Sequence, residues 1–248
     1  MISDRENMLR AIQFRNPEWI PCSAMFLPIV WKAHREKLED VLLRHPRLFK
    51  DFKGGSVDFD HPGDFYRRGD FPDNWGCLWH VEIDGAEGQV VEHPLEDWAS
   101  LDAYQAPDPL KTADRGPVDW DAIRHNSERA KREGRLTGGS VPHGYLFMRL
   151  GYLRGYENFL LDLATDDPHL HRLIEVIHRH NKALVGQYLR LGVDQMSFNE
   201  DLGAAHIQHF HDRAQIVVDR LGRVDDQRVI GRIGLDHRAA DGNGAGRG

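Results

Sequence analysis

The chain has 248 residues, of which 40% are hydrophobic, and this length suits one large α/β domain or two small ones. A formal net charge of −7 and a pI near 6.1 argue against a nucleic-acid-binding protein. Two cysteines are too few for a disulfide framework, the polar opening predicts no signal peptide, and no apolar run reaches the ~20 residues of a membrane helix. We therefore expect a cytoplasmic protein without membrane contact.

The N-terminal part predicts a helix, a strand and a second helix. Ser3 or Asp4 can cap a helix that runs to about residue 14. The apolar stretch 19–28 predicts a first buried strand, and 34–45 predicts a helix. Residues 53–73 show no period and predict a long loop or lid.

The middle of the chain predicts a hairpin and an amphipathic helix. Residues 74–83 alternate like a strand, Asp84-Gly85 marks a turn, and 88–92 can return as the partner strand. Residues 118–134 then predict a helix, capped by Asp119 and closed by Gly134.

Residues 135–203 predict a crossover unit. A strand over 135–141 is followed by a short helix near 155–165, a long helix over about 169–191, and a second strand over 193–199. Such a connection nearly always joins parallel strands. Polar residues follow the C-terminal end of each strand, which is where ligands bind in parallel α/β folds.

The long helix carries the clearest signals. Asp167 suits the N-cap, Pro168 suits the first helical position, and Gly192 suits the left-handed residue past the end. A buried stripe is expected at helical spacing, formed by Leu170, Leu173, Ile174, Ile177, Leu184, Val185 and Tyr188. The histidines at 169, 171, 178 and 180 are expected on its solvated surface.

The composition changes after Gly203. Residues 204–248 contain seven arginines but no lysine, and six aspartates but no glutamate. We therefore divide the chain into 1–203 and an atypical tail, 204–248. The tail is either a natural polar extension or the product of a truncated or frame-shifted gene, and we favour the second interpretation.

Several stretches in order carry a family signal: RENMLRAI at 5–12 with WIP at 19–21, DNWGCLW at 73–79, GQVVEHPL at 88–95, LRGYENF at 153–159 and NEDLG at 199–203. Together they resemble the uroporphyrinogen decarboxylase superfamily, in its uncharacterised decarboxylase-like branch. That superfamily also includes corrinoid-linked methyltransferases, and the resemblance covers about residues 4–203.

The resemblance implies a (β/α)₈ TIM barrel with its site at the C-terminal ends of the strands. About five strands are recognisable before residue 203, so we expect an incomplete barrel. The implied activity is decarboxylase-like or methyltransferase-like, on a small or tetrapyrrole-linked substrate. The methyltransferase branch also implies a corrinoid protein partner and a zinc ion in the complete fold, and a homo-oligomer is conceivable. The Arg-rich segment of the haem-pathway enzymes is missing from 22–28, which counts against porphyrinogen decarboxylation.

Three residues are candidate catalytic groups. Glu200 and Asp201 are adjacent carboxylates at a strand end and could bind a cation or a substrate amine, or act as a general base. Alternatively, they could cap the next helix or make structural hydrogen bonds. His143 follows the preceding strand and could be an acid/base group or an ordinary loop histidine. No metal ligand is assigned.

Three further residues are candidate substrate contacts. Cys22 could be a nucleophile or ligand, or a small core residue. Trp75 and Tyr145 could line an aromatic pocket, although core packing is the alternative for a tryptophan. Two other hypotheses stay open for the whole chain: a truncated, inactive family member, and a small-ligand binding module built on the 75–80 hairpin.

Overall fold

The computed structural model describes residues 2–22, 24–49 and 52–200, which lie in the first of two compact units of the chain, Met1–Leu202. Asp201 and the tail at 204–248 lie outside the described residues. None of the described helices is long and apolar enough to span a membrane.

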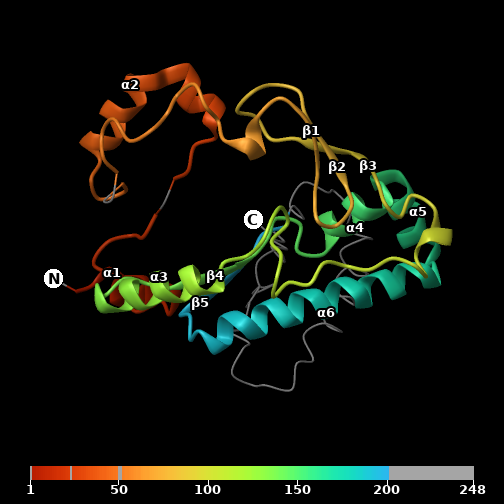
Figure 1. The fold of residues 1–248 in the computed structure, drawn as a ribbon. Helices are drawn as coiled ribbons and strands as arrows, with labels where there is room; N and C mark the ends of the chain where they lie inside the picture. Colours follow the sequence, from red (N-terminus) through yellow and green to blue (C-terminus); the bar gives the residue numbers. More distant parts are fainter. Residues whose placement is uncertain (1, 23, 50–51, 201–248) are drawn as a thin grey trace, which may run out of the picture. The chain divides into compact units, whose positions relative to one another are not determined.

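The crossover predicted from the sequence is confirmed (Figure 1). Strand β4 (Gly138–Val141) pairs in parallel with β5 (Gln195–Phe198), with Gly138 opposite Gln195 and Val141 opposite Phe198. Three helices lie between them in the chain, α4 (Phe147–Arg154), α5 (Tyr156–Thr165) and α6 (Pro168–Arg190). The carboxyl ends of β4 and β5 therefore share one edge of the sheet.

Helix α6 forms as its end signals predict. The Asp167 carboxylate accepts a hydrogen bond from the His169 backbone N–H at 2.8 Å, and Gly192 adopts φ +64° past the C-terminus. Five stripe residues are buried, namely Leu170, Leu173, Ile174, Ile177 and Leu184. The prediction for His180 was wrong: its ring is buried and bonds the Pro107 carbonyl at 3.0 Å, because the 104–109 segment covers that face of the helix.

The predicted hairpin is also confirmed, and it belongs to a larger sheet. Strand β2 (Leu78–Val81) pairs antiparallel with β3 (Gln89–Glu92). A third strand, β1 (Gly69–Pro72), adds to the other side of β2 and lies in the stretch predicted as a loop. Glycine, aspartate and proline are unfavourable in strands, so the sequence of β1 does not indicate a strand, which forms here through pairing with β2.

The strand predicted over 19–28 was wrong, because the described residues there form no strand. The backbone of Glu18 and Trp19 instead bonds the fully buried side chain of Asn7, in helix α1 (Asp4–Ile12). The backbone groups at the beginning of this stretch are thus bonded to a side chain and not to a neighbouring strand. Helix α2 (Pro28–Arg44) follows, with a kink at Arg35, where φ is 47°.

Helix α3 (Trp120–Arg132) begins and ends as predicted, with Asp119 accepting from the Ala122 N–H and Gly134 at φ +66°.

The start of the parallel sheet is fixed by Asp194. Its carboxylate accepts from the Arg5 guanidinium at 2.6 Å and from the Thr137 N–H at 2.9 Å, which ties α1 to both strands.

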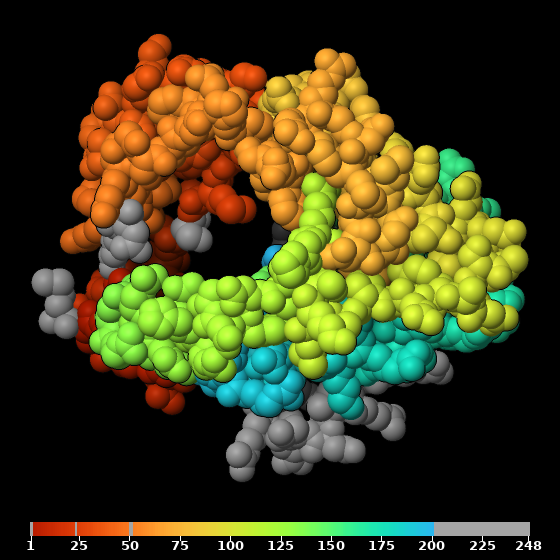
Figure 2. Space-filling view, viewed as in Figure 1, coloured from red at the N-terminus to blue at the C-terminus, as the bar shows by residue number. Residues whose placement is uncertain are grey.

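The described residues hold one three-stranded antiparallel sheet and one parallel pair, and they close no barrel. The (β/α)₈ fold of the family therefore stays an expectation, of which one βαβ unit is present. The surface of the three-stranded sheet meets the surface of the segment that follows β3 (Figure 2). The turn between β1 and β2 is joined to that segment by a hydrogen bond from the Asn74 N–H to the Asp114 carbonyl, 2.7 Å long. This junction positions the candidate site.

Candidate functional site

A pocket of about 200 Å³ lies where the hairpin, the loop at 112–117, the loop after β4 and helix α4 meet. Aromatic side chains form much of its wall: Phe65, Tyr66, Trp79 and Tyr152. Its polar and charged lining comes from Asp73, Glu87, Asp114, Arg115 and His143. A small concave site with aromatic walls and few convergent polar groups is the usual form of a ligand site.

Asp73 is fixed by the turn that precedes β2. One oxygen accepts from the backbone N–H groups of Trp75 and Cys77, at 2.9 and 2.8 Å, and the other accepts from the Trp79 indole at 2.9 Å. Gly76 makes the turn possible, because its φ of +85° is costly for other residues. The Asp73 side chain is only 2% exposed, so its role is to hold the turn and the Trp79 ring in place.

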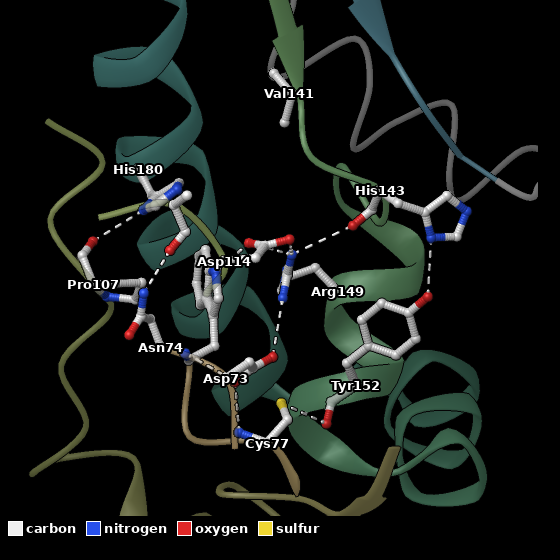
Figure 3. A network of polar contacts seen from close by, with 12 residues as sticks. Asp73, Asn74, Cys77, Pro107, Asp114, Val141, His143, Arg149, Tyr152 and His180 are labelled. Carbon is white, nitrogen blue, oxygen red and sulfur yellow. Dashed lines mark hydrogen bonds and ion pairs between the residues drawn. The ribbon is translucent and has the colours of Figure 1, made fainter. Parts of the chain in front are cut away.

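A buried arginine connects the two sides of the pocket (Figure 3). One terminal nitrogen of Arg149 donates to both oxygens of Asp114, at 3.0 and 3.1 Å, and to the His143 carbonyl at 3.3 Å. The other terminal nitrogen lies 3.8 Å from the Asp73 carboxylate and makes no hydrogen bond with any described residue. The guanidinium also lies over the Trp75 ring, 4.6 Å from its centroid.

The loop that carries Asp114 and Arg115 is tied to the hairpin turn. Besides the backbone bond to Asp114, the Asn74 amide donates to the Ala113 and Gly116 carbonyls, at 2.7 and 3.0 Å. The Trp75 indole donates to Asp114 at 3.1 Å. The two charged side chains of the loop therefore reach the pocket from a backbone that is held at several points.

Arg115 lies in an aromatic box. Its guanidinium carbon is 4.5 Å from the Phe65 ring centroid and 5.6 Å from those of Phe71 and Trp79. Burial lowers the pKa of this guanidinium from its usual value, and nearby Asp73 and Asp114 oppose that shift. An arginine nevertheless stays charged at neutral pH. No described carboxylate makes an ion pair with it, so the pocket offers a cation to an anionic ligand.

His143 reaches the pocket from the end of β4. Its ring Nδ1 lies 3.1 Å from the Tyr152 hydroxyl, and its carbonyl is held by Arg149. The N–H groups of Gly144 and Tyr145 donate to the Asn199 carbonyl, both at 3.2 Å. The loop that carries His143 therefore lies beside the end of β5.

Glu200 follows β5 on the same edge, but its side chain is turned to the backbone of α4. One oxygen accepts from the Leu146 and Phe147 N–H groups, at 2.7 and 2.6 Å, and the other accepts from the Met148 N–H at 2.9 Å. These donors are the unpaired N–H groups of a helix N-terminus, where a carboxylate is favoured. Glu200 therefore makes structural hydrogen bonds, and the helix that it caps is the preceding α4, not the next helix along the chain. Asp201 lies outside the described residues.

The three predicted substrate contacts lie elsewhere in the described structure. Trp75 is 3% exposed and packs on His180, with centroids 4.5 Å apart, so it is a core residue. Tyr145 is half-buried and meets Phe198 edge-on, and burial raises the pKa of its hydroxyl. Cys22 is exposed and lines a separate, mostly apolar groove of about 780 Å³. None of the three lines the pocket of Arg115 and His143.

The described residues do not fit the zinc of the methyltransferase branch. Cys77 is buried, its thiol donates to the Tyr152 carbonyl, and burial raises its pKa far above the usual range. A cysteine that binds zinc must instead be a thiolate. Nowhere in the described ranges do three or more His, Cys, Asp or Glu side chains gather into a metal-binding group.

Sequence reasoning missed five charged residues of this site: Asp73, Glu87, Asp114, Arg115 and Arg149. A signal for Arg149 existed, since it interrupts an apolar stretch, Leu146–Leu153, at a position that faces the core. Buried charges of that kind are nearly always paired. The partners, Asp114 and Asp73, are 35 and 76 residues away, so no local pattern could name them.

Comparison with known proteins gives no match to a protein-family model, to a curated protein or to a solved structure. The function is consequently argued from the pocket and its charges.

Proposed function

We propose that the described part of the chain is an enzyme domain of the uroporphyrinogen decarboxylase-like kind, which binds a small carboxylate substrate in the pocket of Arg115 and His143. The observation that carries the proposal is the position of Arg115. It is a partly buried guanidinium in an aromatic box, and no described carboxylate neutralises it as an ion pair. Guanidinium groups bind carboxylates through two parallel hydrogen bonds.

Decarboxylation suits these groups. Arg115 would orient the substrate carboxylate, and the aromatic walls would strengthen that interaction by excluding water. The carbon–carboxyl bond then breaks, CO₂ leaves, and the electron pair that stays on carbon takes a proton. His143 is placed to give that proton, and the Tyr152 hydroxyl fixes the orientation of its ring.

The size of the pocket favours the small substrate over the tetrapyrrole-linked one. Its volume of about 200 Å³ lies below the roughly 300–1,000 Å³ of pockets for drug-sized ligands. Methyl transfer with a corrinoid protein is a less favoured activity here, because the described residues do not fit its zinc.

A small-ligand binding module without catalysis is the second candidate. The carboxylate oxygens of two acidic residues, Asp73 and Glu200, already accept structural hydrogen bonds. These two carboxylates are therefore unavailable for proton transfer, and the catalytic proposal assigns that role to His143.

The test is to incubate the purified full chain with small carboxylates labelled at the carboxyl carbon and to measure released CO₂. We expect His143→Gln to lower kcat by about 10²–10⁴-fold with little change in KM, since it removes a proton donor. Arg115→Gln should raise KM, and Arg172→Gln, on the exposed surface, should change neither constant. Arg115-dependent binding without CO₂ release would favour the binding module, and loss of neither step in either variant would overturn both candidates.

A further inference from the structure

The pocket contains more negatively charged side chains than positively charged ones, which does not suit a ligand that carries only a carboxylate. Three carboxylates, Asp73, Asp114 and Glu87, line it, against the two guanidiniums of Arg115 and buried Arg149. Apart from His143, these groups sum to one excess negative charge. A singly charged anion would add to that excess, whereas a ligand that also carries a cationic group would not.

Asp114 is the carboxylate with room for such a group. Asp73 is 2% exposed and already accepts three hydrogen bonds, whereas the Asp114 side chain is 29% exposed. A carboxylate has about four acceptor sites. Trp75 and Arg149 together donate three hydrogen bonds to Asp114, two to Oδ1 and one to Oδ2. One site on Oδ2 is therefore available to a donor.

Asp114 and Arg115 are also consecutive in the chain and line the same pocket. An acceptor and a cation on neighbouring residues match a ligand whose own cation and anion sit a few bonds apart. The aromatic walls, including Trp79 and Tyr152, favour both a planar ring and an ammonium group, which aromatic faces attract.

We infer that this pocket binds an aromatic zwitterion the size of an α-amino acid. Its carboxylate pairs with Arg115, its ammonium group donates to Asp114, and its ring lies between the aromatic walls. The inference rests on the proposed function for the Arg115 contact, and the Asp114 contact is the new element.

The test is calorimetric titration of the full chain with three matched probes. L-Phenylalanine carries both charges, 3-phenylpropionate lacks the ammonium group, and 2-phenylethylamine lacks the carboxylate. We expect phenylalanine to bind at least about tenfold more tightly than either of the others. Asp114→Asn should abolish its advantage over phenylpropionate, and Arg115→Gln its advantage over phenylethylamine.

Asp102→Asn, which changes an exposed carboxylate, serves as the matched control and should leave all three affinities unchanged. If Asp114→Asn does not fold, the comparison of the three probes on the unmodified chain still decides. Equal binding of phenylalanine and phenylpropionate, with both lost in Arg115→Gln, would overturn the inference and leave the proposed function standing. Binding of none of the probes would overturn the zwitterion and count against the carboxylate site as well.

Discussion

The carboxylate of Glu200 accepts a hydrogen bond from the backbone N–H of Leu146, at 2.7 Å, and so joins the end of β5 to the start of α4. The contact crosses 54 residues of sequence and brings the loop after β4, with His143, to the end of β5. It makes Glu200 the N-terminal cap of α4, a role that a side chain outside the helix can fill as well as a residue at its start.

Glu200→Gln should lower the free energy of unfolding by about 1–2 kcal/mol, because it removes the charge at the helix N-terminus while keeping an acceptor. Urea denaturation of the variant measures this loss. Glu128→Gln, on the exposed face of α3, should change stability by less than about 0.5 kcal/mol. Equal stability of both variants would show that the cap contributes nothing.

Two consecutive glycines in β4 should differ sharply in their tolerance of a methyl group. A Cβ on Gly139 would lie 2.5 Å from the Met196 sulfur and from the Tyr188 ring, whereas one on Gly138 would meet Gln195 at an ordinary 3.5 Å. We expect Gly139→Ala to destabilise by about 1–3 kcal/mol and Gly138→Ala to be near neutral. Thermal unfolding of the pair checks the predicted packing of α6 on β4, and the reverse order of stability would refute it.

Two histidines should titrate on opposite sides of the ordinary pKa near 6.5. Hydrogen bonds to Glu82 and Asp70 raise the pKa of His80, and burial lowers the pKa of His180. NMR titration of the ring C–H resonances measures both in one sample. In Glu82→Gln the pKa of His80 should fall while that of His180 stays unchanged.

The two shifts act on stability in opposite directions. His80 contributes stability that is fully present below pH ~6.5 and is lost as the pH rises through its folded pKa. The contribution of His180 is present above pH ~6.5 and is lost as the pH falls towards its lower folded pKa. Replacing His180 with Gln should therefore weaken the loss of stability on mild acidification, and an unchanged pH profile would contradict this assignment.

Arg149→Met should destabilise the protein by about 3–5 kcal/mol, since it leaves the carboxylates of Asp73 and Asp114 without their buried cation. Arg172→Met breaks an exposed ion pair with Asp102 and should cost less than about 1 kcal/mol. Guanidinium denaturation of both variants gives the comparison. A loss near 1 kcal/mol for Arg149→Met would mean that the network is not held by this arginine.

Local signals predicted the parts of the fold that local chemistry decides. Asp167, Pro168 and Gly192 mark the ends of α6, and the turn at Asp84-Gly85 marks the hairpin, because caps and turns depend on neighbours within a few residues. The parallel pairing of β4 and β5 followed from the strand–helix–strand order of the crossover.

Long-range pairing decided the rest. The apolar stretch at 19–28 has the composition of a strand, but its described residues form none, and Asn7 bonds the Glu18 N–H and the Trp19 carbonyl at its beginning. The charged network of the site also depends on contacts between residues far apart in the sequence. Arg149 contacts Asp73 and Asp114 because the hairpin turn and the 112–117 loop pack against α4. His143 could be placed because it directly follows a predicted strand.

The most direct test of the account is whether the Arg115 guanidinium binds a carboxylate. Its Nε–Hε resonance, assigned through Arg115→Gln, can be followed by NMR while 3-phenylpropionate is titrated into the full chain. We predict a saturable shift at Arg115 and no shift at exposed Arg172. An unchanged Arg115 resonance, or the same non-saturating drift at both arginines, would contradict the carboxylate site.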